Sequence, residues 1–465
     1  MLSSNLMDNL TLIKEKMHLD ASFDLVYRTI KIADHSACFI FVDGFCKDEL
    51  LEKILQYFLD IKAEEFPQNA YLFLKEKMPY VEVDHSNQED VIITNILSGV
   101  FALFIDTYSE AILIDTRTYP ARGIAEPERD KSLRGSKDCF VETLIFNCSL
   151  IRRRIRSPQL IVKMFTVGKI SKTDVSLIYL SDRVDTHLLS NIEDKIQNLN
   201  CEALSMNQET LAEALVHTPW FNPFPKVRYS ERPDTTCAQI LEGNLVILVD
   251  NSPYACILPA TVYDLVEEVD DYYFPPITGS YLRITRFLIT IFSYTIAPFF
   301  LYATQHPEIL PENLTFLLLK EPANIPVFWQ FLIMELAIDG LRLASVNTPT
   351  MLSTPLSILA ALVLGEFSVS SGFFSREVML IMAFIAVSSY TLPSFELGYA
   401  IKFMRLISLV LTAIFGWIGI LLGHLVLLAA LCFNKTIGGK SYISPLKPYR
   451  PFKGIRHLIR RQKKQ

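Results

Sequence analysis

The sequence predicts a soluble α/β region of two similar subdomains, followed by an all-α multi-pass transmembrane bundle. Three observations lead to this fold class. A hairpin pattern occurs twice in the first 280 residues, long stretches of the remaining chain carry no charge, and residues 435–465 are strongly basic. Half of all residues are apolar (50%) and the mean hydropathy is +0.28, as expected for a chain with a soluble part and a membrane part.

The repeated hairpin begins at Ile96 ("ILSGVFALFIDTYSEAILID") and again at Ile240 ("ILEGNLVILVDNSPYACILP"). Each copy contains a glycine, an apolar strand, an aspartate seven residues after the glycine, a short turn and a second apolar strand. Upstream of each copy, a predicted strand leads into a predicted helix. The pattern predicts α/β subdomains at residues 35–157 and 158–276, after an N-terminal extension at residues 1–34.

No pattern in the α/β region is typical of catalysis or metal binding. The eight cysteines include no C-x-x-C pair, the histidines lack the spacing of zinc enzymes, and neither a Gly-rich phosphate loop nor G-x-S-x-G occurs. We interpret the cysteines as small buried residues. Aspartates that end strands are ordinary turn formers as well as common active-site residues; here they are Asp43, Asp106, Asp115 and Asp250. We therefore expect no enzyme, no cofactor and no metal.

Four arginines close a predicted helix that starts near Lys137: Arg152, Arg153, Arg154 and Arg156. They can dock on phospholipid head groups or on an acidic neighbouring subunit. They can equally form a solvated last turn, where cations favour the helix dipole. The sequence leaves both interpretations open. Nucleic acid is not an expected partner, because the chain outside the tail is acidic and its aromatic and basic residues do not alternate.

Four stretches lack charge for long enough to cross a bilayer: 287–304, 343–365, 378–395 and 406–434. A fifth, 325–341, is interrupted by Glu335 and Asp339. Together they define a predicted transmembrane region at 277–434, and 435–465 forms a basic cytoplasmic tail with ten Lys or Arg and no acidic residue.

Basic residues at both ends of this region predict the orientation. Arg283 and Arg286 precede the first stretch and the basic tail follows the last, so both chain termini are expected in the cytoplasm. The first 20 residues carry charges where a secretion signal needs an unbroken apolar region. Both ends on one side require an even number of crossings. Four crossings leave 325–341 re-entrant, interfacial or packed against the bundle without crossing; six would split 406–434 near Gly416.

Charged and hydroxyl side chains lie within this apolar region. Glu335, Asp339 and Arg342 share one helix face, so each acid can be neighboured by the arginine or by water. Exposure of that face to lipid would cost several kcal/mol per charge. The polar edge continues through Thr348, Thr350, Ser353, Thr354 and Ser357, with Pro349 and Pro355 breaking the backbone ladder. A hydrated pathway explains these residues, and so does a helix–helix interface held by hydroxyls.

Several motifs together resemble the GerA-type spore germination receptor A-subunit family, over residues 35–450. They are "RGSKDCFVETLIFNCSLIRRRIRSPQL", "NPFPKVRYSERPD", "ILEGNLVILVDNSPYACILPATVYDLVEEVDDYY", "HPEILPENLTF", "LPSFELGYAIKFMRL" and "SYISPLKPYRPF". The stretch "ASVNTPTMLSTPLSILAALVLGEF" is more similar to the stage V sporulation protein AF branch than to the A subunits of nutrient receptors.

The resemblance implies a multi-pass protein of the inner spore membrane that forms homo-oligomeric rings and passes ions early in germination. The implied partners are membrane lipid and other germination proteins, either B- and C-subunit-like chains or a small membrane partner. It implies pore-lining roles for Glu335, Asp339, Arg342, Thr350, Ser353, Thr354 and Ser357. The alternative is a membrane-anchored scaffold that clusters germination receptors without conducting. A secondary transporter is disfavoured because no repeat is visible in the membrane region.

Overall fold

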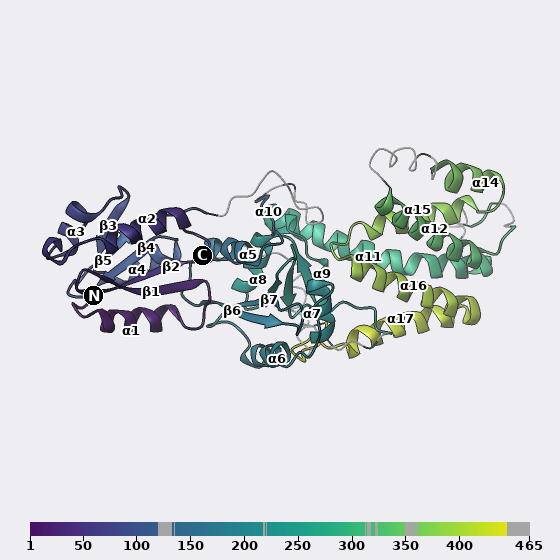
Figure 1. The fold of residues 1–465 in the computed structure, drawn as a ribbon. Helices are drawn as coiled ribbons and strands as arrows, with labels where there is room; N and C mark the ends of the chain where they lie inside the picture. The colour runs from purple at the N-terminus through teal and green to yellow at the C-terminus, as the bar shows by residue number, and fades with distance from the viewer. Residues whose placement is uncertain are drawn as a thin grey trace. The chain divides into compact units, whose positions relative to one another are not determined.

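The structure is a computed structural model that describes residues 1–119, 135–216, 221–311, 324–348 and 361–443, together with 133, 219, 313, 318–320 and 358. The chain forms two compact units (Figure 1). The α/β unit comprises Met1–His217 and Val227–Pro259. The helical unit comprises Thr218–Lys226 and Ala260–Gln465.

The first half of the α/β unit is built on a five-stranded antiparallel sheet with the order β1-β2-β4-β5-β3. Its elements are α1 (Leu6–Met17), β1 (Leu25–Ile32), β2 (His35–Val42), α2 (Asp48–Leu59), η1 (Ala63–Glu65), α3 (Ala70–Lys77), β3 (Val83–Ser86), α4 (Glu89–Leu97), β4 (Phe101–Ile105) and β5 (Ala111–Ile114).

The second half repeats this plan, with the strand order β6-β7-β9-β10-β8 and antiparallel pairing throughout. Its elements are α5 (Leu144–Arg154), β6 (Leu160–Val167), β7 (Thr173–Leu180), α6 (Thr186–Gln197), α7 (Asn207–Leu215), β8 (Arg228–Ser230), α8 (Pro233–Leu241), β9 (Leu245–Val249) and β10 (Ala255–Leu258). Apart from η1, the order of helices and strands is therefore the same in both halves, which agrees with the predicted pair of similar α/β subdomains.

Each central strand is buried on both faces. In β4, Ala102 and Phe104 belong to a core with α1 and α4, whereas Phe101 and Leu103 belong to a core with α2 and α3. Every residue of β4 and β9 is buried. This explains why both strands appear in the sequence as unbroken apolar runs and show no alternation of polar and apolar residues.

The glycine of each repeat ends a helix. Gly99 and Gly243 both have φ +96° and follow α4 and α8. The N–H of Gly99 donates to the Ile96 carbonyl (2.8 Å), and that of Gly243 donates to the Ile240 carbonyl (3.0 Å). A left-handed residue here stops the helix and turns the chain into the next strand, and glycine adopts that conformation without strain.

The aspartate of each repeat caps the first helix of its own half. An Asp106 Oδ1 atom accepts the Leu6 N–H at 3.1 Å, and an Asp250 Oδ1 atom accepts the Leu144 N–H at 3.1 Å. These contacts place a carboxylate at the N-termini of α1 and α5, where helices leave N–H groups without internal partners. The two strand-end aspartates therefore have a structural role.

The boundaries of the halves differ from the predicted ones. Residues 1–34, expected to form an extension, supply α1 and β1 of the first sheet. Helix α5, assigned by sequence to the first subdomain, packs in the core of the second sheet through Leu144, Cys148 and Ile151. It begins at Leu144, later than the expected start near Lys137. Each half therefore starts with a helix that precedes its edge strand.

The described residues of the helical unit form five long helices and several short elements. The long helices are α11 (Pro276–Gln305), α12 (Val327–Asn347), α15 (Arg376–Ser389), α16 (Phe395–Phe415) and α17 (Trp417–Phe433). The short elements are α9 (Val262–Val266), α10 (Asp270–Tyr273), η2 (Pro307–Ile309), the π-helical η4 (Ala361–Phe367) and α14 (Ser368–Ser370). Two of the described helices, α11 and α16, are long and apolar enough to cross a bilayer; α17 is apolar but shorter.

Contacts at both ends of α12 give the directions of its neighbours. Gln330 Oε1 accepts a hydrogen bond from the Ser375 hydroxyl (3.0 Å), and Arg342 donates to Ser389 (2.8 Å), so α12 and α15 run in the same direction. Glu335 pairs with Arg405 while Asp339, one turn later, pairs with Lys402, so α12 and α16 run in opposite directions. The end of α12 therefore lies beside the end of α15.

The helices differ from four predicted stretches. The predicted fifth stretch and the start of 343–365 form one helix, α12, and most of 348–360 lies outside the described residues. The stretch 378–395 corresponds to α15, which ends at Ser389. The stretch 406–434 is divided between α16 and α17 at Gly416, whose φ is +58°. The break lies at the point that the six-crossing alternative requires.

Candidate functional site

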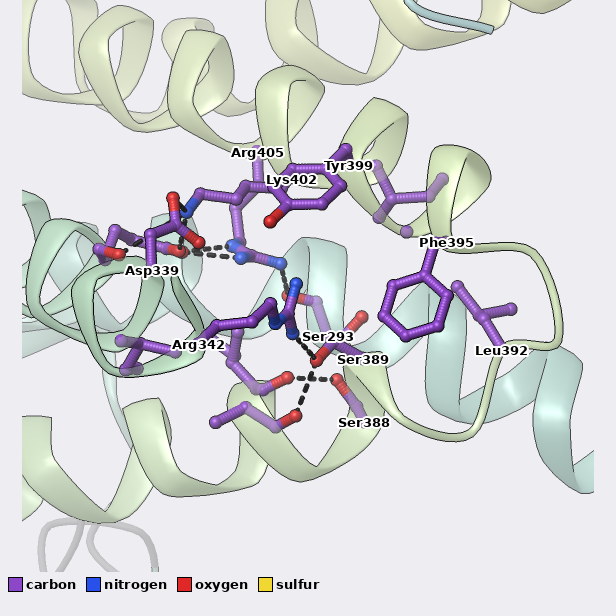
Figure 2. A pocket seen from close by; sticks show the side chains of 16 residues that line it. Ser293, Asp339, Arg342, Ser388, Ser389, Leu392, Phe395, Tyr399, Lys402 and Arg405 are labelled. Atoms are coloured by element: carbon purple, nitrogen blue, oxygen red, sulfur yellow. Dashed lines mark hydrogen bonds and ion pairs between the residues drawn. The ribbon is translucent and has the colours of Figure 1, made fainter. Parts of the chain in front are cut away.

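A polar cavity of about 40 Å³ lies inside the helical unit, between α11, α12, α15 and α16 (Figure 2). Its charged lining residues are Glu335, Asp339, Arg342, Lys402 and Arg405. Serine hydroxyls and the side chains of Tyr399 and Phe395 complete much of the wall. The cavity therefore gathers five ionisable side chains among helices that are otherwise largely apolar.

Both carboxylates of α12 are paired with cations of α16. Glu335 is 5% exposed, and its Oε1 atom accepts from Arg405 Nε (2.9 Å) and Nη2 (2.5 Å). Lys402 Nζ lies 3.3 Å from Glu335 Oε2 and also pairs with Asp339. The acids are spaced i, i+4 and the cations i, i+3, so each pair lies on one helix face. Two facing helices thus match their charges in register.

Arg342 lies apart from the two acids. Its Nη2 atom donates to the Ser389 hydroxyl at 2.8 Å. Its guanidinium carbon lies 5.3 Å from the Tyr390 ring centre and 5.4 Å from that of Tyr399, within cation–π range. The expectation that Arg342 would neighbour the two acids is therefore wrong. Lys402 and Arg405 neighbour the acids instead, because α16 places these cations opposite them.

The structure covers three of the seven residues predicted to line a pore. Glu335, Asp339 and Arg342 lie together at the cavity, with Glu335 turned into the protein's own helix bundle. Thr350, Ser353, Thr354 and Ser357 lie outside the described residues. A pore-lining role for these seven residues stays a prediction.

Sequence reasoning missed Lys402 and Arg405. Both lie inside α16, but their charges made 406 the start of the predicted stretch. The signal that could have found them is complementarity. An apolar helix with two acids one turn apart calls for two cations at helical spacing elsewhere in the membrane region, and "AIKFMRL" supplies them.

The four arginines proposed for docking have contacts within the α/β unit. Arg152 is fully buried; its Nε lies 2.7 Å from Asp24 Oδ2, and its Nη2 donates to the Leu160 carbonyl (3.0 Å). Arg153 and Arg156 lie over the Tyr119 ring, at 4.5 and 6.0 Å from its centre. Enclosure leaves Arg152 without surface to offer a partner, and docking by the other three remains a prediction.

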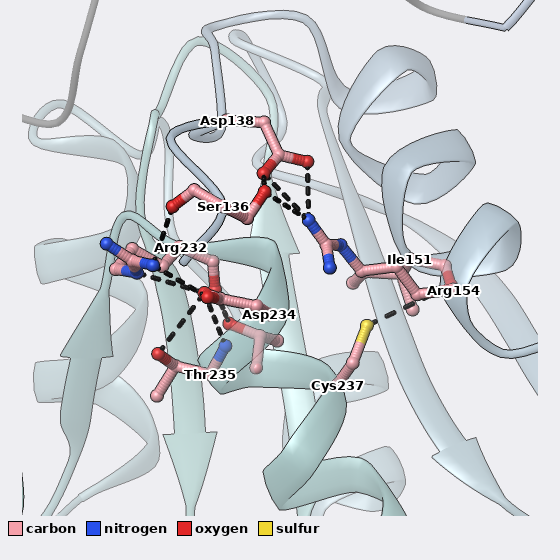
Figure 3. A network of polar contacts seen from close by, with 9 residues as sticks. Ser136, Asp138, Ile151, Arg154, Arg232, Asp234, Thr235 and Cys237 are labelled. Carbon is pink, nitrogen blue, oxygen red and sulfur yellow. Dashed lines mark hydrogen bonds and ion pairs between the residues drawn. The ribbon is translucent and has the colours of Figure 1, made fainter. Parts of the chain in front are cut away.

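Arg154 belongs to a polar network that joins α5 to the segment ahead of it (Figure 3). Its Nη2 atom contacts both Asp138 carboxylate oxygens at 2.7 Å. Arg232, 1% exposed, lies 2.6 Å from Asp234 Oδ2 and donates to the Ser136 carbonyl at 2.7 Å. The network therefore connects α5, α8 and the residues around Ser136.

Two buried cysteine side chains of the α/β unit, Cys148 and Cys237, are not suited to nucleophilic chemistry. Burial raises the pKa of the Cys148 thiol to about 12, and burial likewise raises the pKa of Cys237 to about 12. A thiol must lose its proton to attack, so both side chains act as packing groups. Among the described residues, no three His, Cys, Asp or Glu side chains lie close enough to hold a metal ion.

The arginines used to predict orientation are buried at the start of α11. Arg283 Nη1 lies 2.8 Å from Glu267 Oε1, and Arg286 lies 3.0 Å from Asp271 Oδ2 and 2.5 Å from Glu268 Oε2. Asp271 is fully enclosed. These ion pairs tie α11 to the residues just before it. The cytoplasmic orientation of both termini stays a prediction.

Comparisons with known proteins place this chain in a family. The family model for the Bacillus/Clostridium GerA spore germination protein matches residues 11–465. Stage V sporulation protein AF of Bacillus subtilis (strain 168) is 33% identical over 437 residues, which cover 94% of this chain and 88% of that protein. The chain belongs to the GerA family. The resemblance found from the motifs is thereby confirmed.

Two further similarities involve a membrane protein and a solved structure. The uncharacterized membrane protein YfkQ of Bacillus subtilis (strain 168) is 29% identical over 449 residues, which cover 96% of this chain and 86% of that protein. The N-terminal domain of the A subunit of the Bacillus megaterium spore germinant receptor GerK3 matches 55% of this chain and 95% of its own, with 26% identity and a TM-score of 0.42. Membership in this family of germination and membrane proteins supports a role in spore germination, and the membrane relative and the two apolar helices suggest membrane association.

Proposed function

We propose that this chain is a subunit of an oligomeric ion-conducting channel within a germinant receptor complex, and that it promotes ion release early in germination. The observation that carries the proposal is the depth of the paired charges. Glu335 and Arg405 each lie near the middle of a 21-residue helix, about 30 Å long at 1.5 Å per residue. Charges at mid-bilayer depth are kept in proteins chiefly where ions, protons or substrates pass.

The same proposal includes six membrane crossings. Helices α11, α12, α15, α16 and α17 would supply five. Because α12 and α15 run in the same direction, we propose that the segment between them supplies the sixth. An even number leaves both termini on one side, which we assign to the cytoplasm. The returning segment carries Thr350, Ser353, Thr354 and Ser357, and we propose that it lines the conducting path.

The proposal also includes the partners of the chain. Several copies of this chain would surround one path, since both acids of a single bundle are paired with cations of the same bundle. We place the complex in the inner spore membrane, with B- and C-subunit-like proteins or a small membrane protein beside it. Membrane lipid would cover the outward apolar side chains of the helices, which include Leu336, Leu343 and Val346.

The test is ion flux through the purified full chain in liposomes and planar bilayers. We expect the wild-type chain to conduct. Ser353→Phe and Ser357→Phe should each lose most of the conductance, because a bulky apolar group would narrow and dehydrate the path. Ser205→Phe, at an exposed serine of the α/β unit, is the matched control. Unchanged flux in both pore variants, with assembly intact, would contradict the pore assignment.

One observation favours the scaffold alternative. The two carboxylates of the cavity are both paired within the chain, as in a purely structural network. A scaffold predicts no conductance in bilayers, but loss of receptor clusters in spores that lack the chain. Conductance of the purified chain decides between the two functions.

A further inference from the structure

The charged groups around the cavity do not balance. Among its described lining residues, Glu335 and Asp339 are acidic, whereas Arg342, Lys402 and Arg405 are basic. Figure 2 shows Asp339 beside Lys402, and Arg342 directed to Ser389 of α15. One positive charge therefore has no carboxylate counterpart in the wall of the cavity.

The four other charged groups compensate one another. Arg405 binds a single Glu335 oxygen with two nitrogen atoms, at 2.9 and 2.5 Å. Lys402 pairs with Asp339 and lies 3.3 Å from the second Glu335 oxygen. Neither acid can turn toward Arg342 without leaving another cation of the bundle unpaired, at a cost of several kcal/mol. The surplus charge thus stays with Arg342.

The contacts of Arg342 are with neutral groups. It donates one hydrogen bond to the Ser389 hydroxyl, and two tyrosine rings lie beside it. Its Nε–H is shielded from solvent and has no hydrogen-bond acceptor among the described residues. A guanidinium offers five N–H donors in a planar fork that suits a small anion. Part of that donor set is therefore available.

The cavity also has a suitable size. At about 40 Å³ it exceeds the roughly 10–15 Å³ that one water molecule requires, so it accommodates one small ion with little or no hydration. The Tyr399 hydroxyl lines it and can donate to an anion, whereas the hydroxyls of Ser388 and Ser389, which also line it, donate to the Ile385 and Ala386 carbonyls at 2.7 Å. A metal cation would meet the surplus positive charge, and a large anion would not fit.

We propose that this cavity binds one compact monovalent anion, a halide or a small carboxylate, with Arg342 as its counter-charge. The anion restores neutrality around the five ionisable side chains and accepts the shielded Nε–H of Arg342. It thereby joins α12 to α15 through Arg342 and Ser389. The site does not depend on conductance, and it would serve a channel or a scaffold alike.

Thermal unfolding of the purified full chain in detergent tests the site. The starting buffer contains sodium gluconate, whose anion is too large for the cavity, and sodium chloride, bromide or formate then replaces it at constant ionic strength. We expect a saturable rise of the unfolding temperature with at least one compact anion and none with gluconate alone. Chloride and bromide report a halide, and formate reports a carboxylate. No saturable rise with any of the three overturns the proposal.

Variants locate the site. Arg342→Gln should abolish the saturable rise, while Arg376→Gln, at an exposed arginine of α15, should keep it. Ser389→Ala should weaken anion binding about tenfold, the loss typical of one hydrogen bond near a charge. An unchanged midpoint in Arg342→Gln, or an equal loss in Arg376→Gln, overturns the assignment.

A second variant and a direct measurement cover the case in which Arg342→Gln does not fold. Arg342→Lys keeps the charge and removes the planar fork, so the midpoint for the anion should rise about tenfold. Chloride-35 NMR line broadening of the wild type, reversed by bromide, reports binding without reference to stability. Equal midpoints for wild type and Arg342→Lys, or no broadening, count against the site.

Discussion

Buried arginines have different surroundings in the two units. In the α/β unit, Arg152 contacts both oxygens of one carboxylate, Asp24, at 2.7 and 3.0 Å, and its side chain is fully buried. In the helical unit, Arg405 and Arg342 lie around a cavity with two acids and a third cation. The first arrangement is closed and electrically balanced, and the second is hollow and carries one surplus positive charge.

This difference separates a structural ion pair from a candidate site. Asp24 precedes β1 of the first sheet and Arg152 ends α5 of the second half, so their pair fixes one half of the α/β unit to the other. The charges of the helical unit also join elements, but they leave room and donor groups for a small ligand. Burial alone therefore does not identify a functional charge; the space and the charge balance around it do.

The largest effect is expected at the closed pair. Asp24→Ala leaves the Arg152 guanidinium buried without a carboxylate, and this should lower the stability of the α/β unit by about 3–5 kcal/mol. Hydrogen exchange of the β1 and α5 amides in the full chain measures it. Asp20→Ala, at an exposed aspartate nearby in sequence, should leave exchange unchanged. Equal exchange in both variants would show that the pair does not hold the halves together.

A smaller effect is expected at the hollow cluster. Glu335→Ala removes the partner of Arg405, but Asp339 still pairs with Lys402 and the cavity can admit water, so the expected loss is about 2–3 kcal/mol. Glu335→Leu combined with Arg405→Leu should recover most of it, because both charges leave together. The unfolding temperature in detergent is the measurement.

The exposed Glu366 provides the control for this pair, and Glu366→Ala should be neutral. A double variant no more stable than Glu335→Ala would mean that the two side chains do not interact. In that case the short contact between Glu335 and Arg405 would not stabilise the helical unit, in contrast to the contact expected to stabilise the α/β unit.

Local patterns made the strands and the repeat predictable. The strands β4 and β9 are long apolar runs, and a glycine and an aspartate bracket each run with the same spacing. The role of residues 1–34 was missed although β1 and β2 form a local hairpin, in which Ile32 pairs with His35. Local patterns do not record that this hairpin joins the sheet, because β2 pairs with β4, about 65 residues later in the chain.

The candidate site was predictable only in part. Glu335, Asp339 and Arg342 stand out in sequence because each interrupts an apolar stretch. Lys402 and Arg405 did not, because cations at the edge of such a stretch usually mark the end of a membrane span. Their partners lie more than 60 residues away, at Glu335 and Asp339. Only the antiparallel packing of α12 and α16 brings the four together.

Helix α17 packs closely against α16 at Gly423. A Cβ atom on Gly423 would lie 2.7 Å from the Cβ atom of Ser408 on α16, whereas one on Gly398 would meet no atom within 4 Å. Gly423→Ala should therefore cost about 1–3 kcal/mol by forcing the two helices apart. Gly398→Ala should be neutral or slightly stabilising, since alanine favours helices. Equal unfolding temperatures in the two variants would contradict the tight contact between α17 and α16.

The smallest effects are expected at the two repeat aspartates, and they should be unequal. Asn5 also caps α1 by accepting the Met7 N–H, whereas Thr143, at the same position before α5, makes no such hydrogen bond. Asp250→Ala should therefore destabilise α5 by about 1 kcal/mol, and Asp106→Ala should destabilise α1 by about half as much. Hydrogen exchange of the first-turn amides measures both, with Asp182→Ala as the exposed control. A larger loss in Asp106→Ala than in Asp250→Ala would contradict a shared capping scheme. Helix α1 has a second cap at Asn5 and should therefore depend less on its aspartate.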